Sequence, residues 1–166
     1  MLPSAPLQLD RRTVDTFDSG EPELDSWLRS HAAGSDERRI TRTFVWTEYD
    51  STRVIGYYSL MAHQLIRDAL PKSIGRGSPD TIPAILLARL ALDKSHQGSG
   101  NGAGLLGDAM ERAAVAAANV GARFLVVDAL HDQAAAFYQH FGFKRIPATL
   151  RLVQKVSSIL ASIERA

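Results

Sequence analysis

The hexapeptide Gln97-Gly98-Ser99-Gly100-Asn101-Gly102 lies between two apolar stretches of different character. Residues 85–92 before it are apolar apart from Arg89, which is typical of a buried strand. After it, apolar residues recur at helical spacing on one face: Leu105, Leu106, Ala109, Met110, Ala113, Ala117 and Val120. The sequence therefore predicts a strand, a glycine-rich loop and a helix.

The glycines of this loop suit an anionic ligand. Because glycine lacks a Cβ atom, Gly98, Gly100 and Gly102 are expected to take positive φ and to let a ligand approach the backbone. The first turn of the following helix leaves N–H groups without partners, and the helix dipole favours negative charge there. The loop therefore predicts a site for phosphate or pyrophosphate.

Two other kinds of phosphate loop fit poorly. A Walker loop ends in Gly-Lys-Ser or Gly-Lys-Thr, whereas this sequence has Gly102-Ala103-Gly104. A dinucleotide fingerprint opens a repeated βαβ unit, whereas these glycines follow a strand in the middle of the chain. The structural alternative is an ordinary tight turn or a flexible linker.

The first half of the chain predicts a helix and an antiparallel hairpin. An extended start containing Leu7 and Leu9 leads to Pro22, which suits the first turn of a helix. Residues 35–42 are expected to form a second helical turn. Strands are expected at 43–46 and 54–62, with a reversal at 50–52, and residues 68–83, with three prolines and two glycines, are expected to form a loop.

The second half predicts two further strands and a short helix between them. Gly121 ends the long helix, and residues 124–130 form a buried strand. Asp132 is expected to cap the short helix, which Gly142 stops. Residues 144–156 are expected to form the last strand, and 157–166 a terminal helix or a frayed end.

Composition indicates one globular domain over residues 1–166. The 166 residues, 45% of them hydrophobic, are enough for one core. No apolar run reaches the roughly 18 residues of a membrane helix, cysteine is absent, and residues 1–10 lack the features of a signal peptide, so a cytoplasmic location is expected. Nineteen basic residues oppose eighteen acidic ones, so a nucleic-acid partner would need a local basic patch. No His, Asp or Glu cluster has metal-ligand spacing.

At the loop, the sequence resembles the GNAT superfamily of N-acetyltransferases, whose signature is Gln/Arg-x-x-Gly-x-Gly/Ala. Gln97, Gly100 and Gly102 match this signature. The resemblance implies the α/β GNAT fold, with a mixed central sheet of six to seven strands flanked by about four helices. It also implies acetyl-CoA as co-substrate, with its pyrophosphate on the loop and its pantetheine arm along the preceding strand end. The implied binding residues are Leu90, Ala91, Leu92, Gln97, Gly98, Ser99, Gly100, Asn101 and Gly102.

Downstream, Ala135-Ala136-Phe137-Tyr138-Gln139-His140-Phe141-Gly142-Phe143 looks like the family segment in which a helix tyrosine reaches the CoA sulfur. The resemblance implies Tyr138 as the general acid for the leaving thiolate. Ordinary pKa values of about 8.5 for a thiol and 10 for tyrosine make this transfer only mildly uphill. A positioned acid contributes about 10²- to 10⁴-fold. The structural alternative is that Tyr138 only packs beside Phe137 and Phe141.

A closer resemblance, over nearly the whole chain, is to the bacterial GNAT toxins of type II toxin-antitoxin modules. Three segments carry it in order: Phe17-Asp18-Ser19-Gly20 with Leu24 and Trp27-Leu28; Thr43-Phe44-Val45 with Gly56-Tyr57-Tyr58-Ser59-Leu60; and Leu86-Leu87-Ala88-Arg89-Leu90-Ala91-Leu92-Asp93. This resemblance implies acetylation of the amino group of aminoacyl-tRNA, which blocks translation. It also implies a ribbon-helix-helix antitoxin and a homodimer, for which Trp46 and Tyr57 are equally suited to an interface or to the core.

The residues permit an α-amino acceptor without identifying a base. An α-amino group has a pKa of about 8 and is partly neutral without help, unlike a lysine side chain near 10.4. His63, His96, His131 and His140 have no recognisable acid partner in the sequence and are treated as surface or packing residues. For tRNA phosphates, the candidate basic patch is Arg38, Arg39, Arg42, Lys72, Arg76, Arg89 and Lys94.

Two other functions stay open at this point. One is an acetyltransferase of a small-molecule amine, which should have an acidic or closed cleft. The other is a silent acyl-CoA-binding or interaction module that has kept the fold. Turnover with charged tRNA, turnover with another amine, and CoA binding without turnover would distinguish the three.

Overall fold

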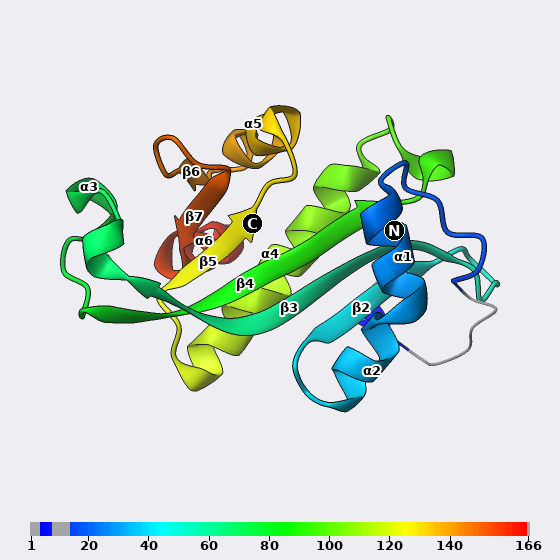
Figure 1. Ribbon diagram of the computed structural model, residues 1–166, viewed down its shortest axis with the longest axis horizontal. Helices are drawn as coiled ribbons and strands as arrows, with labels where there is room; N and C mark the ends of the chain where they lie inside the picture. The colour runs from blue at the N-terminus through cyan, green and yellow to red at the C-terminus, as the bar shows by residue number, and fades with distance from the viewer. Residues whose placement is uncertain (1–3, 8–13, 166) are drawn as a thin grey trace. The chain divides into compact units, whose positions relative to one another are not determined.

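The computed structural model describes residues 4–7 and 14–165, so Leu9 lies outside the described residues. Seven strands form one sheet in the order β1-β2-β3-β4-β5-β7-β6 (Figure 1). Strands β4 and β5 are parallel, whereas β1/β2, β2/β3, β5/β7 and β6/β7 are antiparallel. The predicted α/β class with a mixed sheet of six to seven strands is confirmed. The strands are β1 Ala5–Pro6, β2 Arg42–Thr47, β3 Val54–Ile66, β4 Thr81–Leu92, β5 Phe124–Asp128, β6 Lys144–Arg145 and β7 Arg151–Lys155.

Six α-helices occur in the described part of the chain, where about four were expected. They are α1 Pro22–Ser30, α2 Ala32–Glu37, α3 Lys72–Gly75, α4 Asn101–Val120, α5 Asp132–His140 and α6 Val156–Glu164. Two are short, with six residues in α2 and four in α3. Over the same described residues, no helix is both long and apolar enough to cross a membrane.

The chain forms two compact units, and the first contains the residues up to Met61 together with Ala88–Ala109. Helix α1 begins at Pro22 as predicted, and α2 packs against β2 (Figure 1). The core of this unit includes Phe17, Leu28 and Tyr57, with the Trp27 ring stacked 6.2 Å from that of Tyr57. Trp46 is only 4% exposed and Tyr57 is fully buried, so the alternative that they form an exposed interface is wrong.

The second unit contains Ala62–Leu87 and the residues from Met110 onward. Strand β5 pairs with β4 on one side and β7 on the other, and α5 and α6 pack against β7 (Figure 1). Its core contains Leu65, Ile82, Phe124, Val126 and Val153. Because strand residues two apart point to the same face, Val126 and Val153 mark one face of this part of the sheet.

The prediction of a loop over residues 68–83 is wrong. The segment contains a 3-10 turn ending at Ala69 and helix α3, and β4 begins already at Thr81. Ile82 is fully buried and Ala84 is 4% exposed, so burial of apolar residues on both sides draws Pro83 into the strand. The carbonyl of Pro83 still accepts a hydrogen bond from the backbone N–H of Arg123. Proline in this strand therefore costs one backbone donor and no acceptor.

Further boundaries differ from prediction, among them that of α2, which spans Ala32–Glu37 and not residues 35–42. Residues 144–156 are not one strand, because a turn with Ala148 at φ +62° separates β6 from β7. Residue Asp132 is not the cap of α5: the His131 ring accepts a hydrogen bond from the N–H of Ala134, while Asp132 pairs with Arg145 at 2.9 Å. The terminal helix, α6, is confirmed.

Two glycine-to-alanine substitutions should change stability in opposite directions. Gly142 has φ +95°, and a Cβ there would lie 2.9 Å from the Gln154 amide nitrogen. Gly142→Ala should therefore lower the free energy of unfolding by about 1–3 kcal/mol. Gly107 lies in α4 with nothing within 4 Å of an added Cβ, so Gly107→Ala should raise it by about 0.5–1 kcal/mol. Urea denaturation measures both free energies of unfolding. A change of the same sign and size in the two variants would contradict the different backbone conformations of Gly142 and Gly107.

Candidate functional site

The glycine-rich loop joins β4 to α4 in the first unit. Gly98 has φ +85° and Gly100 has φ +82°, as predicted, and a Cβ built on either would meet no atom within 4 Å. Open space therefore lies over the backbone of both glycines. Helix α4 begins at Asn101, whose side-chain amide donates to the His96 carbonyl at 3.0 Å. The N–H groups of the first helical turn have no partner within the helix and can bind an anion.

The prediction for Gly102 is wrong in one respect. Gly102 does not take positive φ, because it already belongs to the first turn of α4. The chain has to reverse before the helix, and Gly98 and Gly100 alone supply the left-handed conformations for that reversal.

The side chain of Gln97 holds the loop in place. Its amide nitrogen donates to the carbonyl of Leu92 at 2.7 Å and to the carbonyl of Ser19 at 2.8 Å. It thereby links the end of β4 and the loop to the turn that precedes α1. Any ligand contact of Gln97 is therefore left to its backbone and to the side-chain oxygen.

Asp93 is the residue of this region that sequence reasoning missed. It is 3% exposed, and its carboxylate accepts from the N–H of Asp18 at 2.9 Å, from the N–H and hydroxyl of Ser95 at 3.0 and 2.6 Å, and from Arg53 at 3.2 Å. Burial alone would raise the pKa of this carboxyl, but these hydrogen bonds and the Arg53 charge together lower it. The sequence signal that could have identified Asp93 is an acidic residue directly after an apolar strand, with Ser95 two positions later.

The predicted strand-end residues have different environments within the first unit. Ala91 is buried in the core cluster with Phe17 and Leu28, and Leu92 is 8% exposed, while Leu90 is half-buried. The structure brings Leu92 and Gln97 together through the hydrogen bond described above. Contact of these residues with a ligand stays a prediction.

Tyr138 lies in α5 of the second unit and is 7% exposed. Its ring makes edge contacts with Phe137 at 5.4 Å and with Phe143 at 5.7 Å. Burial raises the pKa of Tyr138 well above its ordinary value, because phenolate is poorly solvated there. The phenol therefore stays protonated at neutral pH, and its proton is released less easily than the ordinary pKa of tyrosine predicted.

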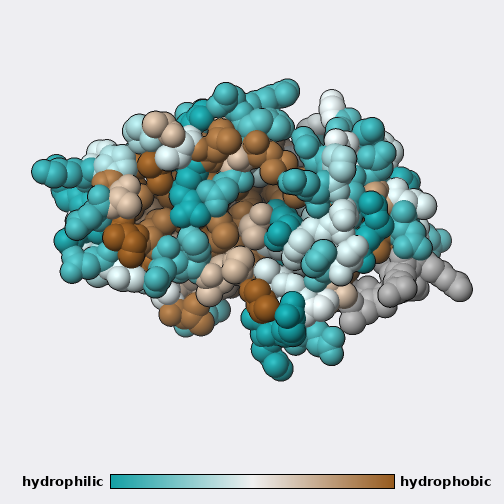
Figure 2. Space-filling view, viewed as in Figure 1, coloured by the Kyte–Doolittle hydropathy of each residue, from teal (hydrophilic) through white to brown (hydrophobic). Residues whose placement is uncertain are grey.

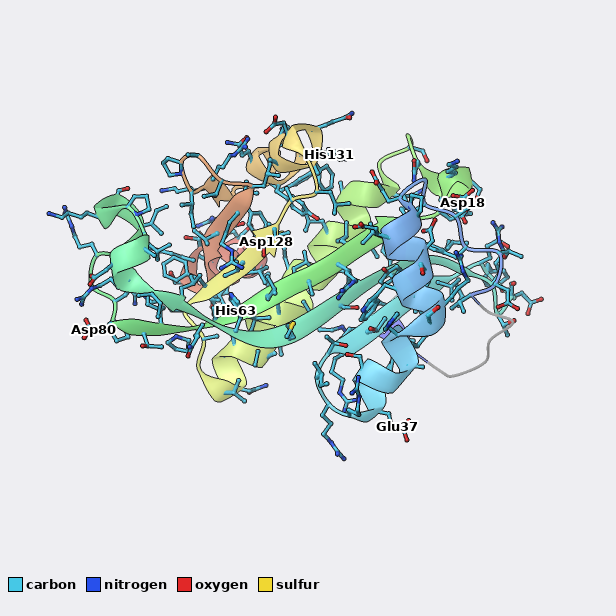
Figure 3. All side chains as sticks on the ribbon, viewed as in Figure 1. Asp18, Glu37, His63, Asp80, Asp128 and His131 are labelled. Atoms are coloured by element: carbon cyan, nitrogen blue, oxygen red, sulfur yellow. The ribbon has the colours of Figure 1, made fainter. Side chains whose placement is uncertain are left out.

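The predicted basic patch is distributed over both units. In the first, Arg42 pairs with Asp36 at 3.0 Å, Lys94 lies 3.6 Å from Asp18, and the Arg89 guanidinium lies 3.9 Å from the centre of the Trp27 ring (Figure 3 labels Asp18). Burial lowers the pKa of Arg89, which still remains charged at neutral pH. Arg38 and Arg39 are exposed at the end of α2.

In the second unit, Lys72 and Arg76 line a cavity of about 560 Å³ together with Arg67. Arg67 is paired with Asp80 at 2.6 Å, whereas Lys72 and Arg76 have no acidic partner among the described residues. These two exposed cations are available to an anionic ligand.

Of the four histidines considered as bases, His63 lies near a pair of opposite charges. His63 lies in β3 and is influenced electrostatically by Asp128 and Arg151. The His96 ring contacts the Ser95 hydroxyl at 2.8 Å, His131 caps α5, and the His140 ring packs on Phe141. Within the described residues, no group of three His, Asp or Glu side chains is arranged to hold a metal ion.

Comparison with known families and proteins identifies several relatives. Residues 41–145 match the model of the acetyltransferase (GNAT) domain. The chain is 42% identical over 145 residues to a protein of Mycobacterium tuberculosis (strain ATCC 25618 / H37Rv) named tRNA-acetylating toxin, and the match covers 87% of this chain and 86% of that protein.

Two solved structures resemble the whole fold. One is AtaT complexed with acetyl-methionyl-tRNAfMet, with a TM-score of 0.86 and 32% identity, covering 96% of this chain and 98% of that one. The other is a variant of the AtaT toxin bound to the C-terminus of the antitoxin AtaR and acetyl-CoA, with a TM-score of 0.80 and 28% identity, covering 97% of this chain and 98% of that one.

Replacing Gln97 should test its bracing role. Gln97→Ala removes two hydrogen bonds to carbonyls and should lower the free energy of unfolding by about 1–3 kcal/mol. Gln97→Glu should lower it further at neutral pH, because a carboxylate would face two carbonyl oxygens. Gln139→Ala on the exposed side of α5 is the control, with a change within about 0.5 kcal/mol. Equal stability of Gln97→Glu and the wild type would show that the amide does not brace the loop.

Proposed function

Because the chain belongs to the GNAT acetyltransferase family, we propose that it is the toxin of a type II toxin-antitoxin module. In this proposal it transfers acetyl from acetyl-CoA to the amino group of aminoacyl-tRNA and so blocks translation. The whole chain, 1–166, acts as a single acetyltransferase domain. The observation that carries the proposal is the sequence identity between this chain and the tRNA-acetylating toxin, which extends over most of both chains.

The β4–α4 loop fits the pyrophosphate of acetyl-CoA. The space over Gly98 and Gly100 is open, and the N–H groups of the first turn of α4, which have no partner within the helix, can bind a doubly negative group. Acetyl-CoA supplies the acetyl group as a thioester. The loop from Gln97 to Gly102 binds and orients it, while Leu90, Ala91 and Leu92 lie along its pantetheine arm.

Tyr138 supplies the proton for the departing sulfur. Its raised pKa keeps the hydroxyl protonated throughout the physiological pH range, which a general acid requires. The edge contacts with Phe137 and Phe143 fix the ring and reduce the cost of orienting it. The cost of burial is a larger uphill step in proton transfer than an exposed tyrosine would have.

The basic patch binds the tRNA backbone. Arg38 and Arg39 in the first unit and Lys72 and Arg76 in the second are exposed cations that phosphates can pair with. Such contacts give affinity that falls with salt but do not identify the acceptor. Arg42, Arg89 and Lys94 contribute after giving up or sharing their present partners.

The proposed partners come from the toxin relatives and not from the GNAT domain alone. The AtaT structure with AtaR supports an antitoxin partner, which we propose to be a ribbon-helix-helix protein. We also propose a homodimer, as the family resemblance implies, and a cytoplasmic location, where charged tRNA is found.

Acetyl transfer to tRNA should depend on aminoacylation. With radiolabelled acetyl-CoA, purified protein should label charged tRNA but not uncharged tRNA, because only the former carries a primary amine. Charged tRNA whose amine has been formylated is the matched control and should stay unlabelled. Equal labelling of charged and uncharged tRNA would exclude the proposed acceptor.

Replacing Tyr138 by phenylalanine should separate acid catalysis from packing. Tyr138→Phe should lower kcat at least about tenfold while acetyl-CoA affinity stays nearly unchanged, since the ring contacts remain and only the hydroxyl is lost. Tyr49, which is 85% exposed, provides the control Tyr49→Phe, with no change in kcat. Unchanged turnover of Tyr138→Phe would remove this residue from the mechanism.

A further inference from the structure

The guanidinium of Arg89, within the first unit, lies over an aromatic stack. Its Cζ atom is 3.9 Å from the centre of the Trp27 ring. The Trp27 ring in turn stacks on Tyr57, with 6.2 Å between the ring centres and 12° between the ring planes. The Tyr57 hydroxyl donates to the Leu24 carbonyl at 2.7 Å, and Phe17 meets the Tyr57 ring edge-on at 5.7 Å. The surface under Arg89 is therefore held by the core of its unit.

The charge of Arg89 has no acidic partner. Among the residues that the structure describes, no carboxylate pairs with this half-buried guanidinium, and the influences on its pKa are burial, which lowers it, and Tyr57, which raises it. Arg42 and Arg53 of the same unit differ, because each pairs with a carboxylate. A partly buried cation without a counterion is unfavourable, so an anionic ligand gains more at Arg89 than at an exposed cation.

The N–H groups of Arg89 are open to a ligand. No nitrogen of Arg89 is among the buried polar atoms without a partner in the described part of the chain, so these groups have accessible surface. Because the Trp27 ring lies against the guanidinium face, the N–H edge is left for two parallel hydrogen bonds, which suit phosphate or carboxylate. Figure 2 shows mainly hydrophilic and intermediate residues on the side of the first unit that carries α1, which favours a polar ligand.

The position of Arg89 on β4 indicates where its anion comes from. Arg89 directly precedes Leu90, and in the proposed function residues 90–92 lie along the pantetheine arm while the glycine-rich loop holds the pyrophosphate. The pantetheine arm carries no charge between the pyrophosphate and the thioester. An anion at Arg89 therefore belongs to the acceptor and not to acetyl-CoA.

The acceptor has one phosphate close to its amine. In charged tRNA the amino acid is esterified to the terminal adenosine, and the nearest anion is the phosphate on the 5′ side of that nucleotide. The 3′ end of tRNA is unpaired, so a single strand can reach a half-buried group that the backbone of a duplex would reach less easily.

We propose that Arg89, held on the Trp27 ring, binds the phosphate on the 5′ side of the terminal adenosine of charged tRNA. The inference rests on the proposed function and assigns one member of the basic patch to one phosphate of the acceptor. Trp27 is a positioning residue, because it orients the guanidinium and does not itself bind the phosphate.

Binding of two acceptor analogues should reveal this site without acetyl transfer. The analogues are 3′-glycylamino-3′-deoxyadenosine with and without a 5′-phosphate. They are titrated calorimetrically into the full-length protein saturated with CoA, which fills the cofactor loop and carries no acetyl group. The phosphorylated analogue should bind the wild type at least about tenfold more tightly, because hydrogen bonds between charged groups contribute on this scale.

Arg89→Met should reduce this affinity ratio to within about twofold and leave the affinity for the phosphate-free analogue within about twofold of the wild type. Arg165→Met removes an exposed arginine at the end of α6 and is the matched control, with an unchanged ratio. A wild-type ratio near one, or an unchanged ratio in Arg89→Met, overturns the inference. If Arg89→Met does not fold, Arg89→Lys replaces it: loss of the planar fork should lower the ratio at least about threefold, and an unchanged ratio overturns the inference.

Variants of Trp27 should test its positioning role. Trp27→Leu should lower the affinity ratio at least about threefold, because the guanidinium loses the ring beneath it. Trp27→Phe keeps an aromatic face and should stay within about twofold of the wild type. A merely structural role would weaken both analogues equally in Trp27→Leu, and that result would exclude positioning by Trp27.

The cofactor is the other source of phosphate. Acetyl-CoA should bind Arg89→Met within about twofold of the wild type, as should acetyl-3′-dephospho-CoA. A loss of about tenfold or more with acetyl-CoA alone would assign Arg89 to a phosphate of the cofactor and overturn the inference.

The binding experiment is independent of the reaction. If charged tRNA is acetylated but the affinity ratio does not depend on Arg89, only the inference is wrong. If charged tRNA is not acetylated but the ratio depends on Arg89, the proposed reaction is wrong and the phosphate site stands.

Discussion

The buried carboxylate of Asp93 is the constraint on which the first unit's site depends. Strand β4 ends there, and the carboxylate binds the Asp18 backbone, the Ser95 turn and Arg53 at the same time. A buried charge is tolerated only when its oxygens are occupied by donors, and here they are. The loop that follows therefore starts from a fixed point, and Gln97 fixes it a second time through Leu92 and Ser19. A backbone held at both ends can present its N–H groups to an anion without first losing conformational entropy.

The second unit holds its tyrosine by apolar packing instead. Tyr138 is surrounded by Phe137 and Phe143, and the positive φ of Gly142 lets the chain leave α5 and return Phe143 to that contact. Apolar surroundings fix the orientation of the Tyr138 ring, but they also destabilise phenolate and so raise the pKa of the hydroxyl. The packing that positions the acid therefore also weakens it. An acid at this position gains more from orientation than from a favourable pKa.

Local patterns predicted the elements, whereas long-range contacts decided their limits. The helix from Asn101, the hairpin and α1 were predictable because periodicity, turn residues and Pro22 are local signals. The early start of β4 was not, because Pro83 and its neighbours looked like a loop until burial of Ile82 drew them into the sheet. The bracing by Gln97 and the grouping of His63 with Asp128 were also hidden, since each joins residues far apart in sequence. From the residues of the glycine-rich loop, only the chemical class of its ligand, a phosphate or pyrophosphate, could be inferred.

The acceptor has to be recognised by chemistry that the glycine loop does not contain. N–H groups at a helix start distinguish an anion from a neutral group, and exposed cations such as Lys72 and Arg76 bind any phosphate backbone. Neither feature distinguishes charged from uncharged tRNA, which differ by an ester-linked amino acid and not by phosphates. Selection requires acceptor atoms aimed at a primary amine, in surroundings that do not stabilise ammonium.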